Sequence, residues 1–296
     1  ALRAMGYHNV DFLVPNRFDF GYGLSVPIVD EAAKQGAEVI VTVDNGISCI
    51  DGVTHAKSLG MQVVVTDHHL PGDVLPPADA IVNPNQPGCE FPSKNLAGVG
   101  VAFYIMLALK AELQQQGYFE KAGVAPPNLA SLLDIVAVGT VADVVVLDKN
   151  NRILVHQGLQ RIRAGKCRPG IKALVEVANR DCAHLTSTDL GFVVGPRLNA
   201  AGRLDDMSQG IACLLEDETI QARMIAAELD ALNKERREIE TGMKAQAETV
   251  LEQMALDEGD MPSALVVYRE DFHQGVIGIV AGRLKEKYLK PVIAFA

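Results

Sequence analysis

Two apolar, β-branched runs in this sequence each end in an aspartate. The run 38–44 ends at Asp44, and the run 61–67 ends at Asp67, 23 residues later. This separation suits a strand, a helix and a second strand. The two carboxylates are therefore expected at the C-terminal edge of one parallel sheet, where open α/β sheets bind ligands. The turn dipeptide Asn45-Gly46 would leave the Asp44 carboxylate at its strand tip.

Two histidines, His68 and His69, follow Asp67 directly. A mixed cluster of carboxylates and imidazoles can bind a divalent ion: carboxylates suit Mg²⁺ and Mn²⁺, and imidazole favours Mn²⁺ or a heavier ion. In the alternative interpretation, Asp67 caps the following turn and both histidines are surface residues. Adjacent histidines at a strand end have little use in packing, which favours the metal site.

A third carboxylate, Asp143, lies within the apolar run 138–147. A buried, unpaired carboxylate costs several kcal/mol, so Asp143 needs a metal, a cation or backbone N–H groups as partners. A helix-end carboxylate that pairs with the backbone is the open alternative. A two-metal hydrolytic site typically needs four or more protein ligands. The candidates named so far offer too few carboxylates to surround two metal ions fully.

Arginines in a basic middle segment are the candidates for holding phosphate. The whole chain carries a net charge of −10, yet residues 149–203 contain ten basic and only three acidic side chains. Arg197 and Arg203 flank a Gly- and Pro-bounded segment and could each bind phosphate oxygens in a forked manner, as could Arg17. Surface salt bridges, and a solvated basic helix face for the segment as a whole, are the alternatives.

The composition excludes several classes of protein. With 296 residues, of which 48% are apolar and 22% charged, the chain can bury a core and is not disordered. No apolar run approaches the roughly 18 residues of a membrane-spanning helix. The five cysteines include no C-x-x-C pair, which fits neither a disulfide framework nor a zinc site and is typical of a reducing cytoplasm. P-loop and G-x-S-x-G motifs are absent.

The elements that must position these residues alternate along the first half of the chain. Strands are expected at 11–15, 38–44, 61–67 and 79–84. Helices are expected at 25–36, 51–59, 97–116 and 129–139. This alternation predicts an α/β fold with a parallel sheet and right-handed crossovers.

The second half of the chain is predicted to be largely helical. Residues 150–210 read as helices separated by Gly and Pro. The helix expected from 217 to about 254 is longer than a usual globular helix and suggests a spacer between domains. A strand, a helix and a strand then follow at 263–268, 275–288 and 291–296.

Taken together, these motifs resemble the DHH phosphoesterase superfamily, which is named after the tripeptide at 67–69. The matching segments fall in the order found in its RecJ branch: 41–48 (VTVDNGIS), 65–71 (VTDHHLP), 95–102 (NLAGVGVA), 138–144 (VGTVADV) and 195–205 (GPRLNAAGRLD). The resemblance implies a parallel-sheet DHH domain with a helical second half over 1–215, a connecting helix over 216–258 and the beginning of an α/β DHHA1 domain over 259–296.

The resemblance also implies an activity and roles for individual residues. The activity would be the metal-dependent 5′ to 3′ exonuclease hydrolysis of single-stranded DNA in repair and recombination, with Mn²⁺ or Mg²⁺ as cofactor. Single-stranded DNA, a single-strand-binding protein and a helicase would be the partners, with no membrane. The metal ligands would be Asp44, His68 and Asp143. The catalytic residues would be Asp67 and His69, which orient the ligands or contact the scissile phosphate. The DNA phosphates would be held by Arg17, Arg197, Asn199 and Arg203.

The sequence departs from the family pattern in three places. It lacks the Asp-x-Asp motif of the first strand, the late glycine- and histidine-rich motif of DHHA1 and the OB-fold domain beyond it. We therefore expect an N-terminally truncated fragment that is inactive alone. A phosphodiesterase of this superfamily acting on oligonucleotides or cyclic dinucleotides, and a non-catalytic DHH scaffold, remain as alternatives. The residues themselves do not distinguish a 5′ from a 3′ end.

Overall fold

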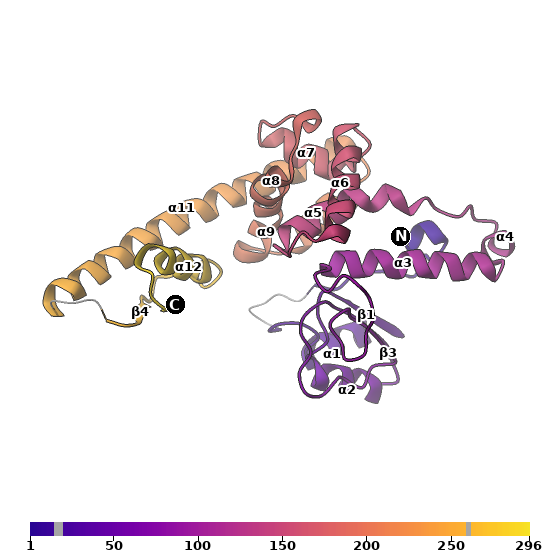
Figure 1. The fold of residues 1–296 in the computed structure, drawn as a ribbon, viewed down its shortest axis with the longest axis horizontal. Coiled ribbons are helices and arrows are strands. Elements are labelled where there is room, and N and C mark those ends of the chain that lie inside the picture. The colour runs from indigo at the N-terminus through magenta and orange to yellow at the C-terminus, as the bar shows by residue number, and fades with distance from the viewer. Residues whose placement is uncertain (15–19, 259–261) are drawn as a thin grey trace. The chain divides into compact units, whose positions relative to one another are not determined.

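Figure 1 shows the computed structural model of the chain, which describes residues 1–14, 20–258 and 262–296. The chain divides into two compact units, residues 1–195 and 196–296. The predicted α/β class with a parallel sheet and a long helix is confirmed. The predicted domain limits at 215 and 258 stay predictions. None of the helices in the described ranges is long and apolar enough to cross a membrane.

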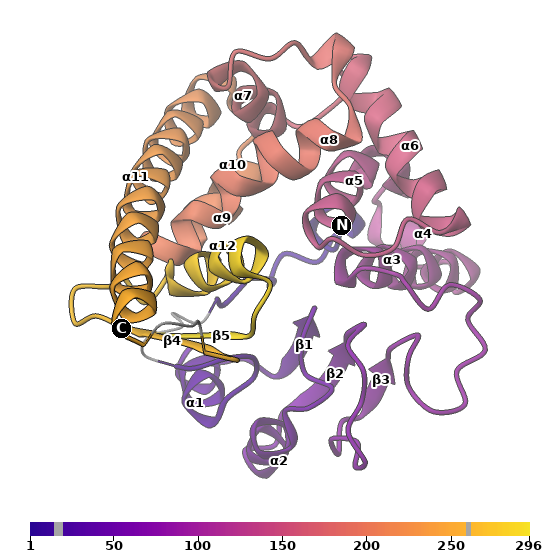
Figure 2. The same cartoon turned by 60° about the vertical axis from the view of Figure 1, so that its left-hand side comes forward.

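The first unit contains a parallel sheet. Its described strands, in spatial order, are β1 (Val39–Val43), β2 (Gln62–Thr66) and β3 (Ala80–Val82). Figure 2 shows the three strands side by side and pointing the same way. The helices before and after β1 are α1 (Val26–Lys34) and α2 (Ile50–Ser58). Val29 of α1, Val53 of α2 and Val63 of β2 are fully buried in one core. The sheet and these two helices therefore pack as two layers around it.

The strand expected at 11–15 is not formed in residues 11–14, which have no regular structure. The prediction of a strand there was wrong because a strand needs a neighbour to bond its backbone N–H and C=O groups, and no described strand pairs with this segment. Its side chains Phe12 and Leu13 are 43% and 37% exposed. Pro15 lies outside the described residues.

Helices complete the first unit after the sheet. Their bounds are α3 (Gly98–Gln115), α4 (Tyr118–Ala122), α5 (Leu133–Ala142), α6 (Lys149–Arg163), α7 (Pro169–Val177) and α8 (Ser187–Asp189). Short 3₁₀ or π turns lie at η1 (Arg3–Met5), η2 (Leu129–Leu132), η3 (Cys182–His184) and η4 (Leu190–Val194). Phe103 of α3, Val136 of α5 and Leu154 of α6 share a buried cluster, which packs these three helices together.

The second unit is organised around the longest helix. Its elements are α9 (from Gly195 to Leu204), α10 (Ser208–Leu215), α11 (Thr219–Glu258), β4 (Leu265–Tyr268), α12 (Ile277–Tyr288) and β5 (Val292–Phe295). β4 and β5 pair in parallel, and α12 packs against α11. Leu251, Leu265 and Leu284 are fully buried in their shared core. The predicted long helix and the strand–helix–strand that follows are therefore present.

Candidate metal centre

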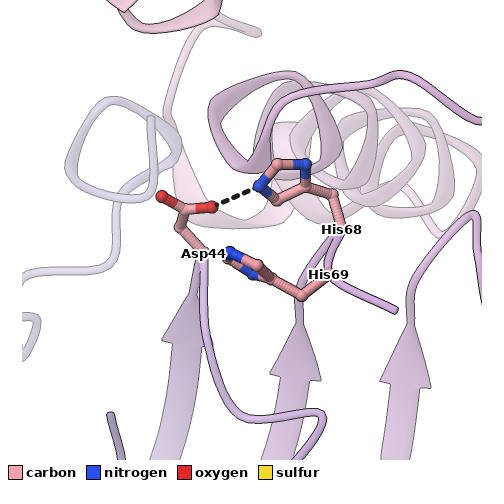
Figure 3. A group of neighbouring side chains, drawn as sticks. All are labelled: Asp44, His68 and His69. Atoms are coloured by element: carbon pink, nitrogen blue, oxygen red, sulfur yellow. Dashed lines mark ion pairs between the residues drawn. The ribbon is translucent and has the colours of Figure 1, made fainter. Parts of the chain in front are cut away.

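The C-terminal ends of the three parallel strands bring polar residues into a row. Val43 pairs with Thr66 and Thr66 pairs with Val82, so the next residues, Asp44, Asp67 and Asn83, continue three adjacent strands. The backbone confirms the alignment, since Asp44 N–H donates to Thr66 O at 3.0 Å and Asp67 N–H donates to Val82 O at 3.1 Å. Figure 3 shows Asp44 and the two histidines beyond the tips of the strand arrows.

The turn after β1 gives Asp44 an unusual backbone conformation. Its φ of 66° is left-handed, a region that aspartate tolerates better than most residues. Gly46 follows with a φ of 111°, and a Cβ there would lie 2.6 Å from Thr42 Oγ1. The Thr42 hydroxyl donates to Asn45 O at 2.7 Å and closes the turn. The predicted tight turn therefore holds the Asp44 carboxylate beyond the strand, where its side chain is 48% exposed.

Asp67 is the buried member of the cluster, with only 1% of its surface exposed. Its Oδ1 accepts the backbone N–H groups of His68 and His69 at 2.7 and 3.2 Å, and its Oδ2 accepts Ile47 N–H at 3.0 Å. Burial raises the pKa of Asp67, but these hydrogen bonds and one from the His69 ring outweigh it and lower the pKa below its ordinary value. Asp67 thus shapes the turn as an ionised acceptor.

His68 lies between two carboxylates. Its Nε2 is 2.9 Å from Asp44 Oδ1 and 3.3 Å from Asp143 Oδ2. Among the described residues this buried nitrogen makes no well-aligned hydrogen bond, although the distances are short. The contact with Asp44 raises the pKa of His68 most, burial opposes this, and the charges of Asp143, Asp44 and Asp67 add to the rise. The His68 nitrogen and the two carboxylates therefore converge on one point, where carboxylate and imidazole donors could share a divalent ion.

Asp143 reaches the same point from the end of α5. It follows the last residue of that helix, its side chain is 30% exposed, and its Oδ2 faces His68. Burial raises the pKa of Asp143, and the nearby Asp44 carboxylate adds to the rise, because two like charges oppose ionisation. Val144 then turns left-handed with a φ of 60°, which is strained for a β-branched residue. The chain therefore leaves the helix sharply after the carboxylate.

His69 completes the group. Its Nδ1 lies 2.7 Å from Asp67 Oδ1. Because Asp67 is held ionised, Nδ1 carries the proton and donates, which leaves Nε2 of a neutral ring with its lone pair. Metal-binding histidines are commonly held by a carboxylate in this way. Asp44, His68 and His69 each offer one ligand atom within 4.8 Å of the others, so the donor set fits a divalent ion.

One glycine that was not among the predicted site residues is part of this arrangement. Gly98 is the first residue of α3, and a Cβ on it would lie 2.5 Å from Asp44 Oδ1 and 2.6 Å from Asp44 Cβ. No side chain larger than hydrogen fits there without moving the carboxylate. The aspartate consequently lies against the start of an 18-residue helix, whose N-terminus favours negative charge. The only signal in the sequence was that Gly98 lies within the family segment 95–102.

The predicted phosphate-binding residues belong to other parts of the chain. Arg17 lies outside the described residues. Arg197, Asn199 and Arg203 all lie on α9, in the second unit. Asn199 is exposed. Arg197 is 8% exposed, and its Nε and Nη2 are both 2.8 Å from Asp230 Oδ1, whereas Arg203 Nη1 donates to Gly275 O at 3.1 Å. Their role toward DNA stays a prediction.

Comparison with known proteins gives consistent results. Residues 1–140 match the model of the DHH family, N-terminal domain. The chain is 62% identical over its whole length to the single-stranded-DNA-specific exonuclease RecJ of Escherichia coli (strain K12) and to that of Salmonella typhimurium (strain LT2). It covers 51% of each of these proteins, so the chain spans about half the length of the curated relatives it matches.

Solved structures agree with this relationship. A crystal structure of exonuclease RecJ bound to manganese is 33% identical, with a TM-score of 0.79, and the match covers 96% of this chain and 67% of that one. A structure of RecJ in complex with Mg²⁺ from Thermus thermophilus is 29% identical, with a TM-score of 0.59, and the match covers 92% of this chain and 42% of that one. From the sequence, the strand-end cluster and these matches together, the chain belongs to the RecJ branch of the DHH family.

Proposed function

We propose that this chain carries the metal centre of a single-strand-specific DNA exonuclease, which hydrolyses phosphodiester bonds from the 5′ end. The observation that carries the proposal is the convergence of Asp44 and Asp143 on the buried Nε2 of His68, at 2.9 and 3.3 Å. The relatives that match the whole chain are named for this activity, and relatives in solved structures hold Mn²⁺ or Mg²⁺.

The residues of the cluster would have different roles in the reaction. Asp44, His68 and Asp143 would hold a divalent ion, and His69 lies beside them in the same cluster. Mn²⁺ or Mg²⁺ bound there would supply a Lewis acid that activates water and offsets the charge growing on phosphoryl oxygens. Asp67 would keep His69 in the tautomer whose Nε2 can accept a proton or meet the substrate, because Asp67 Oδ1 takes the Nδ1 proton.

Two further parts of the proposal rest on the family relationship. The α9 residues Arg197, Asn199 and Arg203, together with Arg17, would hold phosphates of the single strand. A single-strand-binding protein and a helicase would be protein partners. The setting would be the cytoplasm, which agrees with the absence of a disulfide among the described cysteines.

The test uses the full-length protein with 5′-labelled single-stranded DNA and Mn²⁺. We expect His68→Ala to reduce the rate by at least about a hundredfold, because the cluster loses its central nitrogen. Exposed His184→Ala is the matched control and should keep the wild-type rate. A wild-type rate in His68→Ala would end the proposal. Faster turnover of dinucleotides than of long strands would instead indicate a phosphodiesterase for short oligonucleotides.

A further inference from the structure

The backbone of the His68-His69 pair is bonded on both sides by side chains. The N–H groups of both residues donate to Asp67 Oδ1. The two carbonyl groups accept from asparagine amides of the segment that follows β3: His68 O accepts Asn85 Nδ2 at 2.6 Å, and His69 O accepts Asn83 Nδ2 at 2.9 Å. All four backbone polar groups of the pair are therefore satisfied, which fixes the plane of each peptide.

The two asparagines are also bonded to each other. Asn85 N–H donates to Asn83 Oδ1 at 2.8 Å. Asn83 is only 1% exposed and continues β3 directly, so it is anchored to the sheet that carries the rest of the cluster. An amide that has its oxygen and its nitrogen both engaged cannot rotate without losing a bond. The Asn-Pro-Asn turn at 83–85 is consequently a rigid support beside the histidines.

Asn85 bonds a second loop as well. Its Nδ2 also donates to Lys94 O at 3.2 Å. Lys94 in turn donates from Nζ to Pro84 O and Cys89 O, both at 2.6 Å, which closes the loop 84–94 on itself. The chain continues from Lys94 to Gly98, the residue that lies against the Asp44 carboxylate. One amide group therefore connects the backbone of His68 with the loop that leads to the neighbour of Asp44.

We propose that Asn85 is a positioning residue that sets the separation of His68 and Asp44 for a divalent cation, an inference that rests on the proposed function. The imidazole of His68 leaves the backbone next to the carbonyl that Asn85 holds, so loss of that bond lets the ring move relative to Asp44. Side chains that orient metal ligands typically contribute tenfold to a hundredfold in metal affinity. Asn83 supports this role by fixing the Asn85 backbone.

The neighbouring Gln86 offers a matched control. It lies in the same turn, and its Nε2 donates to Ile81 O at 2.9 Å, a bond to the third strand rather than to the histidines. A change at Gln86 thus disturbs the turn and the sheet edge to a similar degree without touching the His68 carbonyl. Gln86→Ala is expected to keep the affinity for the metal.

The experiment measures Mn²⁺ binding to the full-length protein by electron paramagnetic resonance, together with urea unfolding of each variant. Asn85→Ala should weaken Mn²⁺ binding by about tenfold and change the spectrum of the bound ion. Asn85→Asp keeps the shape, removes the donor and adds a negative charge. The charge alone would tighten cation binding, so weaker binding by Asn85→Asp supports positioning. If Asn85→Ala does not fold, Asn85→Ser takes its place.

The outcomes separate this inference from the proposed function. Unchanged Mn²⁺ affinity and an unchanged bound-ion spectrum in Asn85→Ala or its serine substitute would overturn the positioning role while the metal centre stands. Tighter binding by Asn85→Asp together with unchanged binding by Asn85→Ala would show that only charge acts at this position and would also overturn the positioning role. An equal loss of Mn²⁺ affinity in Gln86→Ala would show that Asn85 acts only by holding the turn together, and would overturn the positioning role. Failure of the unsubstituted protein to bind Mn²⁺ would overturn the proposed function and this inference with it.

Discussion

Gly98 and Asp44 are in such close contact that one determines the position of the other. A Cβ at Gly98 would lie 2.5 to 2.7 Å from three atoms of the Asp44 side chain, closer than real Cβ atoms approach any heavy atom. The glycine begins α3 and the aspartate directly follows β1, so this contact joins the helical part of the first unit to the sheet. It also places the carboxylate that faces His68.

Gly98→Ala should therefore weaken metal binding. The added methyl group must displace the Asp44 carboxylate or the start of α3, and either shift changes the 2.9 Å contact with His68. We expect Mn²⁺ affinity, measured by titration calorimetry, to fall by about tenfold or more. Gly278→Ala, at the second residue of α12, is the control, because a Cβ there would meet no heavy atom within 4 Å. Equal affinities of the two variants would show that the contact does not set the ligand position.

Asp67→Asn should destabilise the fold. The carboxylate accepts four hydrogen bonds in a site that is 1% exposed. An amide there turns one acceptor into a donor that faces another N–H. Leaving such a buried group unsatisfied costs about 1–3 kcal/mol of unfolding free energy, measured by urea denaturation. Asp51→Asn, on the exposed start of α2, should change stability by less than about 0.5 kcal/mol. If Asp67→Asn loses no more unfolding free energy than Asp51→Asn, the assignment of Asp67 as a buried hydrogen-bond acceptor is contradicted.

Val144→Gly should stabilise the protein. Valine at a φ of 60° stores strain of about 1–3 kcal/mol, and its side chain is 87% exposed, so little packing is lost. Glycine adopts this conformation freely, at an entropic cost of about 0.5–1 kcal/mol. The unfolding free energy should therefore rise by about 1 kcal/mol. Val146→Gly is the control, since Val146 is also exposed but is not left-handed, and it should lower stability. A decrease in both variants would argue against strain at Val144.

Asp230→Asn should remove a pH-dependent contribution to stability. Burial raises the pKa of Asp230, but its bonds with Lys234 and Arg197 outweigh this and lower the pKa below its ordinary value. A lowered pKa in the folded state contributes stability above the unfolded value of about 3.9, and this contribution is lost as the pH falls through the folded value.

At neutral pH the variant should lose about 3 kcal/mol, because the buried Arg197 loses its ion pair with Asp230. The difference from the unsubstituted chain should shrink as the pH falls below about 3.9, which urea denaturation at several pH values would detect. Asp271→Asn breaks an exposed pair with Arg269 and should cost less than about 1 kcal/mol. A gap between variant and unsubstituted chain that does not depend on pH would contradict the assignment of the pKa to this ion pair.

Local patterns in the sequence predicted most of the elements. The β-branched runs became β1, β2 and β3, and the long helix expected from 217 to about 254 became α11 within a few residues of those limits. The strand predicted at 11–15 is not formed in residues 11–14, because an apolar run becomes a strand only when a neighbouring strand pairs with its backbone. Residues 129–139 divided into η2 and α5, a boundary that the run of apolar residues does not mark.

The sequence by itself determined which residues could meet a cation, because parallel strands joined by helices must end at one edge, and Asp44 and Asp67 are placed there by chain order alone. Tertiary structure decided what each of them does. It buried Asp67 under four hydrogen bonds, left Asp44 facing His68, and placed Gly98 and Asn85 around them. It also placed Arg197 against Asp230. These outcomes depend on contacts between segments distant in the chain, which no local periodicity or spacing encodes.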